Sequence, residues 1–152
     1  GDPDRARELL DAAEEGLRGD SPFPADHART MVGGVRAGLL LAAGDRAGAQ
    51  RALTQAYAAA RRTGDLPILA QVAVHTAALA EAYGHHHESA VLLGAASRLR
   101  GAHDRTDRQV RELSRRGRAA LGEDSFAAAY GKGWELDAQT AVTTVDPNRL
   151  SR

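Results

Sequence analysis

A chain of 152 residues is long enough for one domain with a substantial core, and its 20 Lys and Arg balance 20 Asp and Glu, so no overall field recruits nucleic acid or a membrane surface. The absence of cysteine excludes disulfides, thiolate catalysis and cysteine-ligated metal. No apolar run approaches the roughly 20 residues of a membrane span, and the first residues show no signal-peptide pattern, so we expect a cytoplasmic domain.

Helix signals recur from the start of the chain, and alanine is dense while aromatic residues make up only 4%, a mixture that favours close-packed helices over sheets. Asp2 and Pro3 form an N-cap and a first-turn proline, which predicts a helix through Leu17. The segment Gly19–Pro24 should end it. The next three predicted helices run over 25–43 before Gly44, from cap Asp45 to Thr63 before Gly64, and from cap Asp65 to Tyr83 before Gly84.

The second half of the chain predicts two more long helices and two short ones. Thr106 and Gln109 have the spacing of a capping box, which indicates where the sixth helix begins. The predicted ranges are Glu88–Arg100, Asp107–Leu121, Ser125–Tyr130, and Ala138–Val145 with Asp137 as its cap. We expect residues 146–152 to form a frayed tail.

An apolar pattern recurs in the first, third and fifth predicted helices, at steps of 43 and 41 residues from Ala6 to Ala49 to Ala90. Each step holds two helices and two turns, the length of one helix-pair repeat. The pattern predicts an all-α, right-handed solenoid of stacked antiparallel pairs in one domain, residues 1–145, with pairs near 2–43, 45–83 and 88–121 and a cap at 124–145. Five glycines inside these helices indicate close helix contacts or mere tolerance of glycine: Gly33, Gly34, Gly38, Gly48 and Gly94.

Several segments resemble known repeats. Gly44-Asp45 and Thr63–Pro67, each before an alanine-rich helix, are similar to degenerate tetratricopeptide repeats. Ala90–Arg100 (AVLLGAASRLR), Arg118–Tyr130 (RAALGEDSFAAAY) and Gly133–Asp137 (GWELD) resemble the last repeat of large actinobacterial transcriptional regulators, of the LuxR type with an ATPase module and of the SARP type. The resemblance implies the C-terminal regulatory part of such a bacterial protein, whose DNA-binding and ATP-binding motifs would lie upstream.

Two short motifs invite a chemical interpretation. Neutral imidazoles bind zinc, nickel or copper, so the run His85, His86 and His87 is a weak metal candidate, although consecutive side chains on a helix point in different directions. The alternative is a solvated turn, which we favour. Gly131-Lys132-Gly133 lacks the glycine frame and the Ser or Thr of a phosphate loop. We therefore predict no catalytic residue, metal or cofactor.

The sixth predicted helix carries the main candidate surface. Arg108, Arg111, Arg115 and Arg118 follow steps of three and four, so they share one face opposite an apolar face. Between Arg98 and Arg118 the chain has eight arginines against three acids. The stripe is either a solvated face or a docking face for an acidic partner or another domain. Direct nucleic-acid contact is not expected, because no aromatic residues are interleaved.

Three aromatic residues follow this helix: Phe126, Tyr130 and Trp134. Phe126 and Tyr130 are four apart and share a helix face, so we expect the three to cap the C-terminal end of the stack, with ligand stacking as the alternative.

The leading functional prediction is a protein-interaction and regulatory scaffold that binds a peptide, a protein segment or an upstream domain of the parent protein. A small-molecule sensor with an effector between helices is the alternative, and a metal-dependent enzyme is a remote third. A homo-oligomer remains open.

Overall fold

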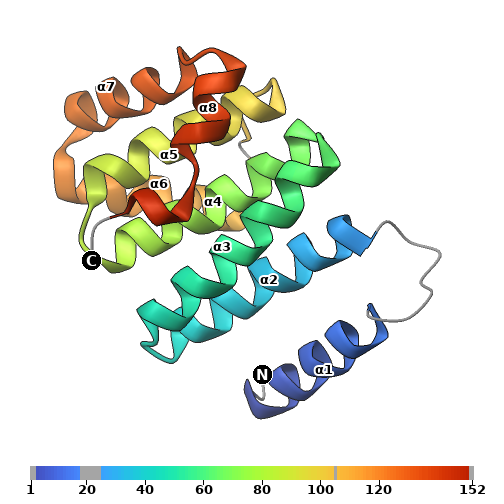
Figure 1. Cartoon of the computed structure of the whole chain (residues 1–152). Coiled ribbons are helices and arrows are strands. Elements are labelled where there is room, and N and C mark those ends of the chain that lie inside the picture. The colour runs from blue at the N-terminus through green and yellow to red at the C-terminus, as the bar shows by residue number, and fades with distance from the viewer. Residues whose placement is uncertain (1–2, 18–24, 105, 151–152) are drawn as a thin grey trace.

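The structure, a computed structural model, describes residues 3–17, 25–104 and 106–150. Within this part the chain forms eight α-helices and a 3-10 turn and has no strand, which confirms the all-α prediction (Figure 1). The predicted linker Gly19–Pro24 lies outside the described residues. The helices are α1 Pro3–Gly16, α2 Ala25–Ala42, α3 Arg46–Thr63, α4 Leu66–Ala82, α5 His86–Arg100, α6 Arg108–Leu121, α7 Glu123–Trp134 and α8 Ala138–Thr144, followed by η1 Pro147–Arg149.

Local signals set the boundaries of α2, α3 and α4 within a residue of the prediction. The Asp45 carboxylate accepts a 2.7 Å hydrogen bond from the backbone N–H of Gly48 and caps α3. Gly44, Gly64 and Gly84 follow the three helices with φ of 81°, 67° and 82°, a left-handed conformation that an L side chain disfavours.

The starts of α5 and α6 differ from the prediction. Helix α5 begins at His86, two residues early. Helix α6 is capped by Asp107, whose Oδ1 accepts from the backbone N–H groups of Gln109 and Val110 at 2.7 and 3.0 Å. The capping box predicted from Thr106 is wrong, because the Thr106 hydroxyl instead donates to Asp104.

Helix α7 is twice as long as predicted and continues through Gly131-Lys132-Gly133. Gly133 lies where α7 crosses α5. A Cβ placed on Gly133 would collide with the Val91 carbonyl oxygen, and a Cβ on Gly94 would collide with the Tyr130 carbonyl oxygen. The two helices therefore meet backbone to backbone. Close packing there offsets the roughly 1 kcal/mol that a glycine costs in a helix.

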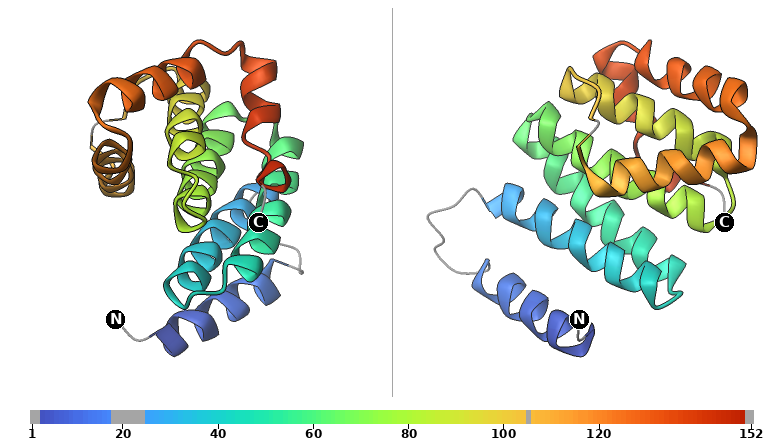
Figure 2. Two further views of the ribbon diagram at one scale, coloured as in Figure 1. Left: turned by 90° about the vertical axis from the view of Figure 1, so that its left-hand side faces the viewer. Right: turned by 180° about the vertical axis from the view of Figure 1, so that it is seen from behind.

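The most extensive helix contacts join α2 to α3, α4 to α5, and α5 to α7. Helices α2, α4 and α6 also contact one another in that order and form one layer, seen from behind in the right-hand view of Figure 2. Helices α1 and α2, and helices α3 and α4, which the sequence predicts as pairs, are also in contact. The right-handed solenoid itself stays a prediction.

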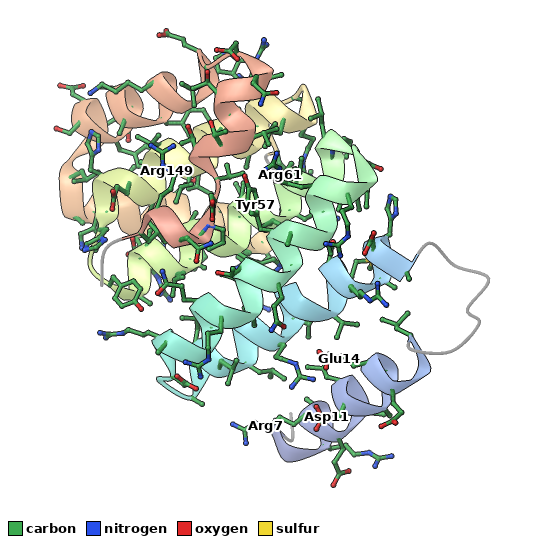
Figure 3. The ribbon with its side chains drawn as sticks, in the orientation of Figure 1. Arg7, Asp11, Glu14, Tyr57, Arg61 and Arg149 are labelled. Atoms are coloured by element: carbon green, nitrogen blue, oxygen red, sulfur yellow. The ribbon has the colours of Figure 1, made fainter. Side chains whose placement is uncertain are left out.

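Helix α1 packs on α2 mainly through charge. Among its described side chains only Leu10 is buried, while Arg36 on α2 donates to Asp11 at 2.7 Å and to Glu14 at 3.0 Å (Figure 3). These two hydrogen bonds raise the pKa of Arg36, the bond to Asp11 most strongly. Leu9, beside Leu10 on α1, is 57% exposed.

The C-terminal segment folds back onto α3, so the predicted frayed tail is wrong for residues 146–150. The Gln50 amide donates to the carbonyl oxygens of Pro147 and Leu150 at 2.9 and 3.3 Å, and the Tyr57 hydroxyl donates to the Val142 carbonyl at 2.8 Å. Leu150 is only 7% exposed. Figure 3 shows Tyr57 and Arg61 of α3 near Arg149 of this segment. Residues 151–152 lie outside the described part.

The core lies between the layers and is built from alanines around a few large side chains. The largest fully buried apolar ones are Leu53, Val72, Leu79, Leu93 and Val145. No helix in the described part of the chain has the length and apolar character needed to cross a membrane.

The α5–α7 contact generates the first prediction. Gly133→Ala should lower the free energy of unfolding by about 1–3 kcal/mol, because the new methyl group must push the two backbones apart. The melting temperature should fall by roughly 5 °C, measured by circular dichroism at 222 nm. Gly131→Ala is the matched control on the same helix. Its Cβ would meet nothing within 4 Å, so Tm should stay constant or rise. Equal melting temperatures for the two variants would refute the contact.

Candidate functional site

Helix α6 turns an apolar side to the core and its arginines to solvent. Val110, Leu113 and Gly117 are buried, as the sequence predicts. The ring of Phe126 from α7 packs against Gly117, where a Cβ would lie only 2.8 Å from the ring. Ala120, three residues after Gly117, is exposed.

The four predicted arginines of α6 do not form one site. Arg111 and Arg118 line a groove between α6 and α7, whereas Arg108 lines a second groove between α6, α4 and α2. Arg115 lies on neither groove and donates two hydrogen bonds to Glu112 at 2.8 and 3.0 Å. The α6 helix is therefore a shared wall, with a groove on each side.

The first of these, the α6–α7 groove, has a volume of about 510 Å³. It joins two predicted sets that the sequence analysis treated separately, the arginine stripe and the aromatic cap. The Arg118 guanidinium lies 4.5 Å from the centre of the Phe126 ring and donates to Glu123. The residues that line the α6–α7 groove are His103, Asp104, Val110, Arg111, Ser114, Arg118, Phe126, Ala127 and Tyr130.

Polar bonds hold the aromatic residues of α7 in place. The Tyr130 hydroxyl donates to the Ser97 hydroxyl on α5 at 2.7 Å and lies 2.8 Å from His103 Nδ1. The Trp134 and His103 rings are 4.1 Å apart. The aromatic residues thus join α7 to α5 and to the loop before α6. His103 was missed in the sequence, where nothing about its spacing marked it.

Asp104 is the one acid among the residues that line the α6–α7 groove, and its carboxylate already has partners within the chain. It pairs with Arg100 and accepts from the backbone N–H groups of Asp107 and Thr106, which lower its pKa. The Arg111 guanidinium forms no ion pair or hydrogen bond with any described residue. It is available to an anionic ligand.

The second groove, which we call the concave groove, has a volume of about 620 Å³. Its floor is apolar and its charged residues gather mainly on the α6 wall. The lining residues are Gly38, Leu41 and Ala42 from α2, Ala78, Glu81 and Ala82 from α4, and Arg108, Gln109, Glu112, Leu113 and Arg116 from α6. Arg116 and the α2 residues were missed in the sequence, where the arginine spacing alone drew attention.

The acids of the concave groove have hydrogen-bond partners within the chain. Glu112 accepts from Arg115 and, at 2.8 Å, from Arg116, and these hydrogen bonds lower its pKa to about 2. Glu81 lies 2.9 Å from His86 Nδ1. The Arg108 guanidinium has no ion-pair or hydrogen-bond partner among the described residues. The α6 wall of this groove is therefore left with positive charge.

The histidine run does not converge on one point. The His85 ring stacks on Tyr83 with centres 5.9 Å apart, His86 pairs with Glu81, and His87 is exposed. Across residues 3–17, 25–104 and 106–150, no three His, Asp or Glu side chains gather in a way that suits a metal ion.

His75 on α4 packs against α2 where Gly34 leaves room, since a Cβ on Gly34 would lie 2.7 Å from the imidazole. Burial lowers the pKa of His75, and Asp107 at the start of α6 acts in the opposite, weaker sense. The neutral imidazole is therefore the form that fits between the helices.

Comparisons with protein-family models, with curated proteins and with solved structures find no match for this chain.

The buried imidazole generates a pH prediction. The unfolded chain binds a proton at His75 near pH 6.5, whereas the folded chain binds it only at lower pH. The free energy of unfolding therefore keeps its full His75 contribution above pH 6.5 and decreases as the pH falls below that value. The contribution is at most about 1.4 kcal/mol per pH unit. In urea titrations from pH 7.5 to 5, the free energy of unfolding of His75→Gln should fall less steeply with pH than that of the wild type.

His87→Gln, at an exposed position, is the control and should keep the wild-type slope. A wild-type slope in His75→Gln as well would show that the imidazole titrates alike in both states.

Proposed function

We propose that this chain is a non-catalytic protein-interaction and regulatory scaffold that docks a partner in the concave groove. The observation that carries the proposal is an apolar stripe on α2 that continues into the groove. Met31 and Val35 are 58% and 53% exposed, and Gly38 and Ala42 extend the same line at steps of three and four. Two of these four positions line the groove itself.

Single exposed apolar residues are ordinary, whereas a contiguous patch beside a groove is typical of a docking surface. Along α2 the surface between the groove and the contact with α1 is apolar over its whole length. These positions are Ala28, Met31, Val35, Gly38, Leu39 and Ala42. No described residue covers Met31 or Val35 to any large extent, so a partner would remove real apolar area from water.

The resemblance to the C-terminal repeats of actinobacterial regulators supports a regulatory setting. On that basis the scaffold belongs to a larger cytoplasmic transcriptional regulator of a bacterium. Its partner is a protein segment or an upstream domain of the same protein, and it makes no direct contact with nucleic acid.

The α6–α7 groove favours a second candidate function, a small-molecule sensor. Its free Arg111, the Tyr130 hydroxyl and the Phe126 ring suit a small aromatic compound that carries a negative charge. This alternative uses the opposite side of α6, so the two candidates are separable by mutation.

Site-specific photo-crosslinking in cells that naturally express the protein tests the docking proposal. A photoreactive residue at Val35 should give discrete crosslinks, either to another protein or within the parent protein, because a docked partner covers that position. The same residue at Ala128, exposed on α7 and outside both grooves, is the control. Adducts that are identical at the two positions would rule out docking in the concave groove.

Native mass spectrometry of the purified protein separates the sensor from the scaffold. A bound compound below about 1 kDa that is lost in Arg111→Glu but kept in Val35→Asp would favour the sensor.

A further inference from the structure

We infer that the occupant of the concave groove is an acidic amphipathic α-helix of a partner protein, about three turns long. Its apolar side would lie on the α2 stripe and its carboxylates would face Arg108 and Arg116 on α6. The inference rests on the proposed function and adds the partner's secondary structure and charge.

The length follows from α2. Met31 and Ala42 are eleven residues apart, which corresponds to about 17 Å along a helix axis. A helix laid along this stripe therefore contacts it over about three turns and needs apolar side chains at i, i+3 or i+4, and i+7.

The small residues on the floor of the concave groove allow an incoming helix to approach closely. Gly38, Ala78 and Ala82 have little or no side chain, and a Cβ on Gly38 would meet nothing within 4 Å. Leu41 and Leu113 stand on the two sides of this small-residue floor. A ridge of larger apolar side chains from an incoming helix fits such a shallow trough.

An extended peptide suits the groove poorly. Its backbone N–H and C=O groups need partners at the binding surface, whether from a sheet edge or from neutral polar side chains. All three walls are helices, and Gln109 is the one neutral polar side chain among the lining residues. A helix satisfies its own backbone and requires only the apolar floor.

The sign of the partner's charge follows from the ion pairs. Glu112 is shared by Arg115 and Arg116, and Glu81 lies 2.9 Å from His86 Nδ1, so both carboxylates already have hydrogen-bond partners within the chain. Arg108 has no such partner in the described part of the chain. Guanidinium groups form forked hydrogen bonds with carboxylates, so Asp or Glu on the flank facing α6 completes the site.

A peptide-display library tests the occupant directly. It holds N-capped 14-residue helical sequences with random apolar residues on one face and either Asp and Glu or Lys and Arg on the flanks, selected against the purified full chain. We expect acidic-flanked helices to be enriched. Enrichment of basic-flanked peptides, or no enrichment of helices at all, overturns the inference.

Two arginines on α6 provide a matched pair for the selected peptide. Arg108 and Arg111 are both exposed, and neither has an ion-pair partner among the described residues, but Arg108 lines the concave groove and Arg111 the α6–α7 groove. Arg108→Glu should weaken binding about tenfold or more and reduce its salt dependence, whereas Arg111→Glu should leave it within about twofold. Equal losses would place the peptide elsewhere.

Val35→Asp should abolish binding of the same peptide without lowering Tm, since the side chain is exposed in the free protein. Unchanged affinity for Val35→Asp would also overturn the inference.

A second copy of this chain is the remaining occupant to distinguish. Helix α1 is itself amphipathic and acidic, and its Leu9 is exposed. A concentration-dependent dimer in analytical ultracentrifugation that is lost in both Leu9→Asp and Val35→Asp would assign the groove to α1 of another copy and overturn the inference of a different partner protein.

The photo-crosslinking experiment separates the two levels of the proposal. An adduct at Val35 whose crosslinked segment is not an acidic helix refutes this inference and leaves the scaffold function standing. No specific adduct refutes both.

Discussion

The contact between α5 and α7 is the constraint on which the rest of this structure depends. Gly94 and Gly133 each lie against a carbonyl oxygen of the opposite helix, so no side chain separates the two backbones. Helix α5 also contacts α4, α6 and α8, which makes it the element around which the C-terminal half is assembled. Because α7 is held so close to α5, α6 is tied on one flank to α7 and on the other to α4. The position of α6, and hence the shape of both grooves, therefore depends on a contact that only glycine at positions 94 and 133 permits.

This position gives α6 two different chemical neighbours. Toward α7 its arginines meet aromatic rings, a hydroxyl and an imidazole, whereas toward α4 and α2 they border a floor of small apolar residues. The same residue type therefore has a different role on each side of one helix. Tyr130 also has two roles, because its hydroxyl donates a hydrogen bond to Ser97 on α5 and its side chain lines the α6–α7 groove.

Features that depend on neighbours in sequence were predictable. The Asp45 cap and the left-handed glycines at 44, 64 and 84 set helix ends through contacts within a few residues, and these boundaries agree with the structure. Features that depend on distant contacts were not. The sequence predicts that the seventh helix ends at Tyr130, because the packing of Gly133 against Val91 is not visible in it. It likewise predicts a frayed tail, because the contact with Gln50 on α3 is not visible in it. The 3-4 spacing of the α6 arginines correctly predicts a common outward face. It carries no information on which neighbouring helices divide that face into two grooves.

The ion pairs around Glu112 determine how the concave groove responds to its surroundings. With a pKa of about 2 for Glu112, and with guanidinium groups that remain protonated far above neutrality, the α6 wall keeps the same charge across the physiological pH range. The pairs are exposed, so they add little to stability, and their attraction for a carboxylate is screened by salt within about 10 Å at 0.1 M. The apolar stripe on α2 does not respond to salt in this way. A partner held by both surfaces would therefore associate at a rate that depends on ionic strength, while the apolar contact would set how long the complex lasts.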